Sequence, residues 1–274
     1  MINKIKKILI KSKLRNKSLF TSRNLLHQLL LYIFYKKNKK LIKSNKSIHN
    51  SYNGQRCFIL FTGTSLIDLD FDIIKNENII SSGKAFLHKD FNKLNPVAVF
   101  QPGPWELRSL NLLEFISSCV YRNTNNGCHV FFDTTAYPYL SHIVESRLED
   151  TYFLSQIGNY ISSDNIQSDL HKPNNIQEGA LSIGLGIASY MGFKEIYLLG
   201  SDFLTDPPVY GHFYDGFYEV ADAADYESYR ERASWMIRHI EKKGCKVINV
   251  IKDEKQASSI GSVTFEELKV SLSN

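Results

Sequence analysis

Residues 179–203 read GALSIGLGIASYMGFKEIYLLGSDF and carry the clearest signal of the fold class. The first part is apolar and rich in small residues, which predicts a helix over Glu178–Met191. The second part predicts a short buried strand over Glu195–Leu199. A helix that runs directly into such a strand is the repeating unit of a parallel sheet covered by helices.

Similar apolar runs recur along the chain, and none shows a clean alternation of apolar and polar residues. That pattern is typical of strands buried on both faces of a parallel sheet. Further helices are predicted over about 105–121 and 222–243. The sequence therefore predicts an α/β, Rossmann-like, doubly wound, mostly parallel sheet, whose ligands bind beyond the carboxyl ends of the strands. The other predicted strands are Cys57–Phe61, Ile79–Ser81, Val97–Phe100, His129–Phe132 and Lys246–Val250.

The charge of the chain is unevenly distributed. Residues 1–50 contain 14 Lys and Arg and no acidic residue, whereas the other 224 residues contain 19 basic and 28 acidic groups. We therefore expect two parts: a basic amphipathic N-terminal extension and linker over residues 1–50, and a Rossmann-like domain over residues 51–274. Residues 36–55, which are polar, are expected to form the linker.

The extension contains an apolar run, Leu25–Tyr35, with the helical period. Eleven helical residues span about half of a bilayer core, and no small-residue cleavage site follows, which argues against a span or a signal peptide. We expect residues 1–45 to lie on an anionic membrane surface. A helix docked on the domain, followed by a solvated lysine-rich arm, is the alternative. The sequence contains no known nucleic-acid module, so no nucleic-acid partner is expected.

Four cysteines lie far apart with no CxxC spacing, which indicates neither a disulfide framework nor a zinc site. Buried thiols in a reducing compartment are the simplest interpretation. Together with the basic extension, this predicts a cytoplasmic protein, peripheral on the inner face of the membrane.

The candidate ligand-binding residues follow the predicted strands. The first loop contains Gly63, which permits a tight turn, and Ser65, which we expect to form a capping box with Asp68. Backbone N–H groups there could face a phosphate, although a glycine and a cap can also simply start a helix. The candidate nucleotide-binding residues are Thr62, Gly63, Thr64, Ser65, Gly83, Lys84, Gln101, Pro102, Gly103, Gly179, Ser201 and Asp202.

The densest cluster of chemically active side chains lies eleven residues and more beyond the fifth predicted strand, where Tyr210, His212 and Tyr214 occupy every second position. An imidazole can accept a proton near neutral pH, and a phenolic hydroxyl can donate a hydrogen bond to a departing phosphate. These three residues are the candidate catalytic group, and a hydrogen-bonded structural histidine is the alternative. Asp202 and Asp206 match no standard metal spacing, so no metal site is predicted.

Four segments resemble the bacterial lipooligosaccharide sialyltransferases and related surface-polysaccharide glycosyltransferase-like proteins. They are Cys57–Leu66, Gly83–Phe86, Ala98–Gly103 and, above all, Gly179–Phe203 with the Tyr210 and His212 that follow. The resemblance covers most of Arg56–Val250. It implies an inverting, metal-independent transfer of sugar from a CMP-linked donor, CMP-sialic acid in that family, to a cell-surface glycan acceptor in lipopolysaccharide biosynthesis. It implies no cofactor besides the nucleotide-sugar donor.

The resemblance also implies roles for single residues. His212 matches the catalytic base and Tyr210 a tyrosine beside the leaving phosphate, while Gly63 and Ser65 match the nucleotide loop. Gln101 occupies the position of an asparagine that contacts the donor.

The sequence differs from the pattern of that family in the first loop, which reads FTGTSL, in the short stretch between Tyr210 and His212, and at three further positions. Gly83 replaces an asparagine, Asn175 an arginine and Leu204 a tyrosine. Two alternatives therefore stay open: a magnesium-dependent diphosphokinase-like transferase, and a non-catalytic scaffold with a degenerate nucleotide site.

Overall fold

The computed structural model describes residues 29, 33, 36–101, 127–137, 150–154, 166–172, 179–215, 219–220, 223–252, 257–258 and 260–273. The predicted helix over 105–121, most of the apolar run 25–35, and Pro102, Gly103 and Asn175 lie outside these residues.

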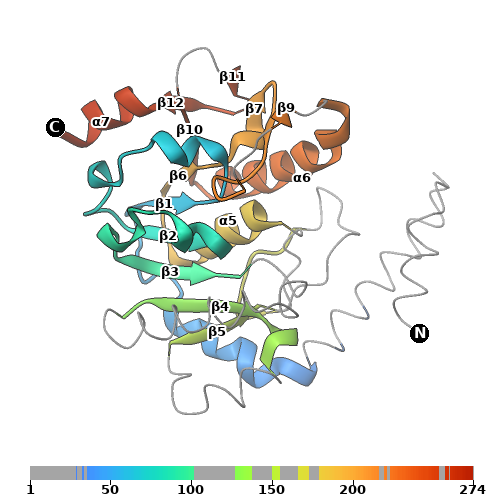
Figure 1. Ribbon diagram of the computed structural model, residues 1–274. Coiled ribbons are helices and arrows are strands. Elements are labelled where there is room, and N and C mark those ends of the chain that lie inside the picture. Colours follow the sequence, from blue (N-terminus) through green and yellow to red (C-terminus); the bar gives the residue numbers. More distant parts are fainter. Residues whose placement is uncertain are drawn as a thin grey trace.

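Eight strands form one sheet, and every neighbouring pair in it is parallel (Figure 1). Their order across the sheet is β12-β10-β6-β1-β2-β3-β4-β5. This confirms the predicted α/β, Rossmann-like fold class. The strands are β1 (Arg56–Leu60), β2 (Ile79–Ser82), β3 (Pro96–Phe100), β4 (His129–Asp133), β5 (Thr151–Leu154), β6 (Glu195–Leu199), β10 (Lys246–Ile251) and β12 (Ser262–Thr264).

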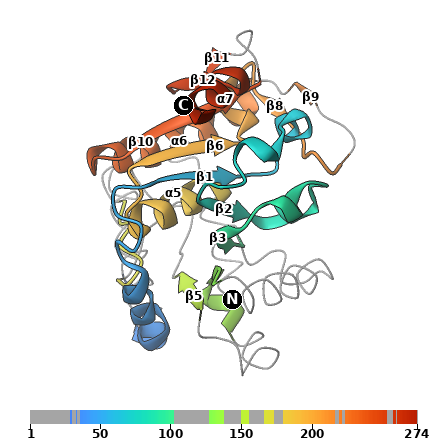
Figure 2. The same cartoon turned by 90° about the vertical axis from the view of Figure 1, so that its left-hand side faces the viewer.

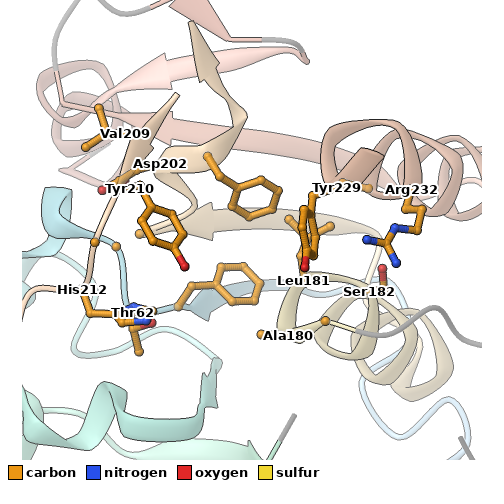
Figure 3. A pocket seen from close by; sticks show the side chains of 17 residues that line it. Thr62, Ala180, Leu181, Ser182, Asp202, Val209, Tyr210, His212, Tyr229 and Arg232 are labelled. Carbon is orange, nitrogen blue, oxygen red and sulfur yellow. Dashed lines mark hydrogen bonds between the residues drawn. The ribbon is translucent and has the colours of Figure 1, made fainter. Parts of the chain in front are cut away.

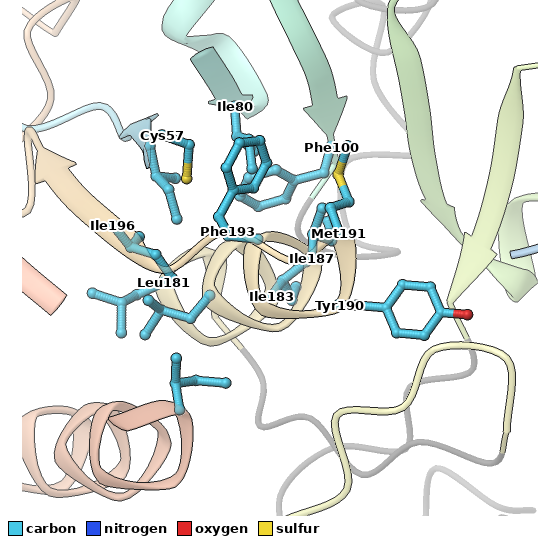
Figure 4. Close-up of a cluster of buried hydrophobic side chains, with 14 of the residues drawn as sticks. Cys57, Ile80, Phe100, Leu181, Ile183, Ile187, Tyr190, Met191, Phe193 and Ile196 are labelled. Atoms are coloured by element: carbon cyan, nitrogen blue, oxygen red, sulfur yellow. The ribbon is translucent and has the colours of Figure 1, made fainter. Parts of the chain in front are cut away.

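Successive residues of β1 explain why the strands show no alternation. Cys57 and Ile59 belong to a buried cluster that includes helices α5 (Ala180–Met191) and α6 (Ala223–Lys242) (Figure 4). Phe58 and Leu60 belong to the cluster on the opposite face. Both faces are therefore apolar because both are covered.

The two faces are covered by different elements. Helices α5 and α6 pack on one face (Figure 2). The other face, for which the sequence predicted only the start of a helix near Ser65, is covered by short 3₁₀ helices and by α7. These elements are η2 (Thr64–Asp68), η3 (Phe71–Ile73), η4 (Gly83–Leu87), η5 (Phe91–Lys93) and α7 (Phe265–Ser273).

Helix α5 approaches the sheet closely because its central residues are small. A Cβ atom at Gly184 would lie 3.1 Å from both Ile59 Cγ2 and Phe100 Cζ. Gly184 therefore allows close packing of α5 on β1 and β3.

The strand order reverses between β1 and β6. From β1 the chain adds β2 to β5 on one side, then returns to place β6 against the other side of β1, followed by β10. The loops after β1 and β6 diverge at this point, which is where open parallel sheets bind their ligands.

The segment before β1 packs on the domain and is not a linker over residues 42–48. Residues 36–44 are helical and η1 (Asn45–Ile48) follows. Ile42 and Ile48 are buried, and the Asn45 amide donates to the carbonyls of Phe153 and Leu170 at 2.9 and 2.8 Å. Asn45 thereby occupies backbone groups of the outermost strand β5, which would otherwise form an open sheet edge. The linker prediction failed because the lysines around these three buried residues dominate the composition.

Two small two-stranded sheets extend the loops after β6 and β10. β7 (Thr205–Asp206) pairs with β11 (Ala257–Ser258), and β8 (Val209–Tyr210) pairs with β9 (Glu219–Val220). Among the described residues, no helix is both long and apolar enough to cross a membrane.

Candidate functional site

A pocket of about 580 Å³ lies beside the carboxyl ends of β1 and β6 (Figure 3). Its volume falls within the usual range for small-molecule sites. The loops after both strands, the start of α5 and one side of α6 form its walls. The lining residues are Phe61, Thr62, Gly63, Gly179, Ala180, Leu181, Ser182, Gly200, Asp202, Phe203, Val209, Tyr210, Gly211, His212, Tyr229, Arg232 and Ala233.

Asp202 joins the two loops that diverge at the strand-order reversal. Its carboxylate accepts hydrogen bonds from the Ser65 backbone N–H at 2.8 Å, from the Ser65 hydroxyl, and from the Thr64 hydroxyl at 3.0 Å. The side chain is buried, with 7% of its surface exposed. The anion that the first loop receives in this structure is therefore the protein's own carboxylate.

The same contacts change the expected role of the first loop. The predicted capping box between Ser65 and Asp68 is wrong, because Ser65 bonds Asp202, 137 residues away. Gly63 donates its N–H to the Gly200 carbonyl at 2.9 Å, and a Cβ atom there would lie 2.5 Å from that oxygen. Only a glycine lets the two loops approach this closely.

His212 is attached to the first loop as well. Its Nδ1 lies 2.8 Å from Thr62 Oγ1, and the neighbouring Phe213 N–H donates to the Thr62 carbonyl at 3.0 Å. The ring is half-buried and lines the pocket. Since Nδ1 is engaged by Thr62, proton exchange with a ligand falls to Nε2.

The two predicted catalytic tyrosines occupy different positions. Tyr210 lines the pocket, and 49% of its surface is exposed. Tyr214 is not among the lining residues; its ring stacks on His212 with centroids 5.1 Å apart. The Lys84 ammonium lies 5.2 Å from the centroid of Tyr214. Lys84, which is not a lining residue, therefore contacts the aromatic ring that stacks on the imidazole.

The remaining candidate residues are divided between the pocket and the interior. Gly179 lines the pocket. Ser201 is 2% exposed and donates to Asn249 Oδ1 at 2.6 Å, inside the protein. Gly83 and Gln101 are buried and are not lining residues, whereas Pro102 and Gly103 lie outside the described residues.

Three polar lining residues were not predicted from the sequence: Ser182 on α5, and Tyr229 and Arg232 on α6. The Arg232 guanidinium lies 4.6 Å from the centroid of the Tyr229 ring. The spacing of Tyr229 and Arg232, one helical turn apart, was an available signal that both face one side. In other respects the sequence around these two residues is typical of a solvent-exposed helix surface.

No group of three or more His, Cys, Asp or Glu side chains in the described part of the chain could hold a metal ion. Asp202, which the sequence placed nearest to such a role, is occupied by the hydrogen bonds of the first loop.

The chain is similar in structure to a protein of known structure. No protein-family model and no curated protein sequence matches the chain. The chain is similar to the MAf glycosyltransferase from Magnetospirillum magneticum AMB-1, with a TM-score of 0.47 and 15% identity. The match covers 86% of this chain and 40% of that protein. The chain thus matches less than half of the length of that glycosyltransferase.

Proposed function

We propose that the chain is a glycosyltransferase-like enzyme that moves a sugar from a nucleotide donor to a hydroxyl acceptor. The observation that carries the proposal is the Thr62–His212 pair, which presents an imidazole to a 580 Å³ pocket at the strand-order reversal. Parallel sheets bind nucleotides at this position, and an imidazole oriented by a fixed partner suits a general base.

The proposed reaction is a single displacement with inversion at the anomeric carbon. The acceptor oxygen forms the new bond to that carbon while the bond to the phosphate oxygen breaks, and the phosphate leaves with the electron pair. His212 Nε2 takes the proton of the acceptor hydroxyl. In this tautomer Nδ1 carries the proton and donates a hydrogen bond to Thr62 Oγ1, which leaves Nε2 free of a proton.

We assign Tyr210 to assistance of the leaving group. It lines the same pocket as His212, and its hydroxyl can donate a hydrogen bond to the departing phosphate. Tyr214 does not line the pocket, so we assign it a positioning role, stacked on the imidazole.

The donor is proposed to be CMP-linked, as in the sialyltransferases that the sequence resembles. The support is the resemblance of Gly179–Phe203 together with the pocket beside Gly63. Thr64 and Ser65 would act indirectly, by holding the loop through Asp202.

An anionic membrane surface is the proposed partner of the basic extension, in keeping with a peripheral enzyme that acts on a glycan or lipid-linked acceptor. Lys36, Lys40 and Lys43 are exposed and recur at helical spacing, on the side away from the buried Ile42 and Asn45. Each such lysine contributes about 1 kcal/mol to binding an anionic surface.

This surface is best tested in the full chain, because deletion of residues 1–45 would also remove the buried Ile42 and Asn45. We expect Lys36→Glu/Lys40→Glu/Lys43→Glu to reduce sedimentation with phosphatidylserine liposomes and to leave unfolding unchanged. Exchange of Lys246 and Lys269, exposed lysines elsewhere, is the control. Equal sedimentation of all three proteins would contradict the membrane role.

The experiment that tests the enzymatic proposal is a screen for nucleotide release from CMP-, UDP- and GDP-linked sugars, with and without EDTA. We expect acceptor-dependent release from one donor, retained in EDTA and absent in His212→Ala. Activity that needs ATP and is lost in EDTA would indicate a diphosphokinase-like transferase. Absence of both activities and of nucleotide binding would indicate a scaffold.

A further inference from the structure

Tyr229 lies on the core-facing side of helix α6, yet its ring is not covered by the core. The same side continues at helical spacing with Ala233, Met236, Ile237 and Ile240, each of which is at most 4% exposed. Tyr229, one turn before Ala233, is 55% exposed, and both residues line the pocket. The pocket therefore occupies the place where the core would continue, and the aromatic ring forms part of its wall.

Other aromatic rings line the same pocket. Tyr210 on β8 is 49% exposed, and Phe61 and Phe203 follow β1 and β6. The large hydrophobic side chains of the described residues that are exposed include two aromatic ones, Tyr210 and Tyr229, and both belong to this pocket. Aromatic surface gathered in a cavity is typical of a site for a flat ring, because stacking adds to the gain from burying apolar area.

Tyr229 is oriented by a contact within its own helix. The Arg232 guanidinium, three residues further along α6, lies 4.6 Å from the centroid of the Tyr229 ring. In Figure 3, Arg232 lies on one side of Tyr229 and Tyr210 lies on the other. A flat ligand that stacks on Tyr229 would therefore approach it from the side of Tyr210.

The lining residues follow the order of the chemical groups in a nucleotide sugar. Across the pocket in Figure 3, Thr62 and His212 come first, then Tyr210, then Tyr229. In the proposed reaction the anomeric carbon lies near His212, and the departing phosphate lies near Tyr210. The ribose and the base follow the phosphate in such a donor, so the base would lie at Tyr229.

We infer that Tyr229 stacks on the nucleobase of the donor, which lies between α6 and the start of α5. The inference rests on the proposed function for the direction of the donor in the pocket, and it adds the residue that recognises the base. Stacking on an aromatic ring accepts every base. Tyr229 would therefore determine the preference for a nucleotide over a sugar phosphate without a base, and not the choice among bases.

The test compares CMP, UMP and AMP with ribose 5-phosphate, which has no base. Nucleotide binding is measured by titration calorimetry, and ribose 5-phosphate binding by its displacement of the nucleotide that binds most tightly. We expect Tyr229→Ala to weaken binding of that nucleotide about tenfold, as for the loss of one stacked base. The affinity for ribose 5-phosphate should stay unchanged.

Matched variants separate stacking from bulk and from folding. Tyr229→Phe keeps the ring and should bind the nucleotide like wild type, whereas Tyr229→Leu keeps apolar bulk without an aromatic face and should be intermediate. Glu231→Ala removes an exposed side chain that does not line the pocket, so it should leave binding unchanged. A thermal-unfolding scan establishes that each variant is folded.

Three results would overturn the inference. They are equal nucleotide binding by Tyr229→Ala and wild type, an equal loss of affinity for the nucleotide and for ribose 5-phosphate, and no nucleotide binding by wild type. Steady-state kinetics provide a further check, because stacking on the donor base predicts a raised KM for the donor in Tyr229→Ala. A raised KM for the acceptor alone would instead assign Tyr229 to the acceptor and contradict the base site.

Failure of the proposed function is a separate result. Nucleotide binding that depends on Tyr229, without sugar release from any donor, would contradict the transferase and keep the base site. Sugar transfer by a chain whose nucleotide affinity does not depend on Tyr229 would contradict the base site and keep the transferase.

Discussion

Asp202 and His212 follow the same strand, ten residues apart, and differ in how their hydrogen-bonding capacity is used. The Asp202 carboxylate accepts three hydrogen bonds and is 7% exposed. His212 is held through Nδ1 by Thr62 and presents the rest of its half-buried ring to the pocket. Both contact the loop after β1, yet one locks that loop in place and the other is available for chemistry. Polar residues at a strand end are thus distinguished by what their atoms already bind.

The largest expected effect is that of His212→Ala on transfer. Loss of a general base lowers the rate about 10²–10⁴-fold. The unfolding free energy should change by less than about 1 kcal/mol, because the ring lies at a pocket wall. Nucleotide release and urea unfolding, measured on the same preparation, check the two halves of this prediction. Wild-type turnover in the variant would remove His212 from the mechanism.

Asp202→Ala should show the opposite profile, with its main effect on stability. The substitution leaves the Ser65 N–H and the Ser65 and Thr64 hydroxyls without their acceptor. We expect a loss of about 3 kcal/mol in unfolding free energy, measured by urea denaturation. Asp202→Asn keeps one acceptor oxygen and should lose less. An unchanged midpoint in Asp202→Ala would show that the carboxylate does not lock the loops.

Thr62→Val tests the contact that connects the two regions. The exchange keeps the side-chain shape and removes the hydroxyl near His212 Nδ1. Loss of this one hydrogen bond should lower kcat about tenfold and alter the pH–rate profile, whereas Thr62→Ser should restore both. A raised KM with an unchanged kcat would show that Thr62 does not orient the base.

The smallest expected effect is a change in the pH dependence of stability, and it concerns His88. This histidine is buried, whereas His212 is half-buried at the pocket. Both of its ring nitrogens are engaged: Nδ1 accepts from the Asp90 N–H at 3.2 Å, and Nε2 lies 3.1 Å from the Leu66 carbonyl. Its ring stacks on Phe71 with centroids 4.1 Å apart. Burial lowers the pKa of His88 below its ordinary value.

The lowered pKa of His88 determines how its contribution to folding stability depends on pH. Below the ordinary pKa of histidine the unfolded chain binds a proton that folded His88 resists, so stability falls as the pH falls through that value. His88→Gln removes this proton, and its unfolding free energy should depend less steeply on pH between 7 and 5.5. Equal slopes for the variant and wild type would contradict the assignment. Burial lowers the pKa of His129 and His239 too, so part of the slope should persist.

The parallel sheet could be predicted because most of its strands have a local pattern of apolar residues. In β1, Phe58 and Ile59 face opposite covered surfaces, so the whole run is apolar, and the same pattern marks β6. β5, Thr151–Leu154, was not predicted, and neither was β12, Ser262–Thr264, which contains a single apolar residue, Val263. Asn45 could not be recognised either, since its partners on Phe153 and Leu170 are more than 100 residues away.

The candidate site was predictable only in part, for the same reason. His212 and Tyr210 stand out because they form a dense cluster beyond a strand, and both line the pocket. The role of Ser65 was predicted wrongly because Ser65 bonds the distant Asp202 and not its apparent local partner, Asp68. Arg232 was not predicted, because its spacing from Tyr229 shows only that the two residues share a side of the helix, and its place in the pocket depends on how α6 packs beside the start of α5.

The most direct measurement is titration of CMP, CDP, UDP and ATP into the wild-type chain and into Ala180→Trp. Ala180 lines the pocket in the first turn of α5, and an indole there would occupy the space. We expect one nucleotide to bind wild type with a stoichiometry of about one, as for a single pocket, and its binding to be lost in a folded Ala180→Trp. No binding by wild type, or equal binding by both proteins, would show that the pocket between β1 and β6 is not a nucleotide site.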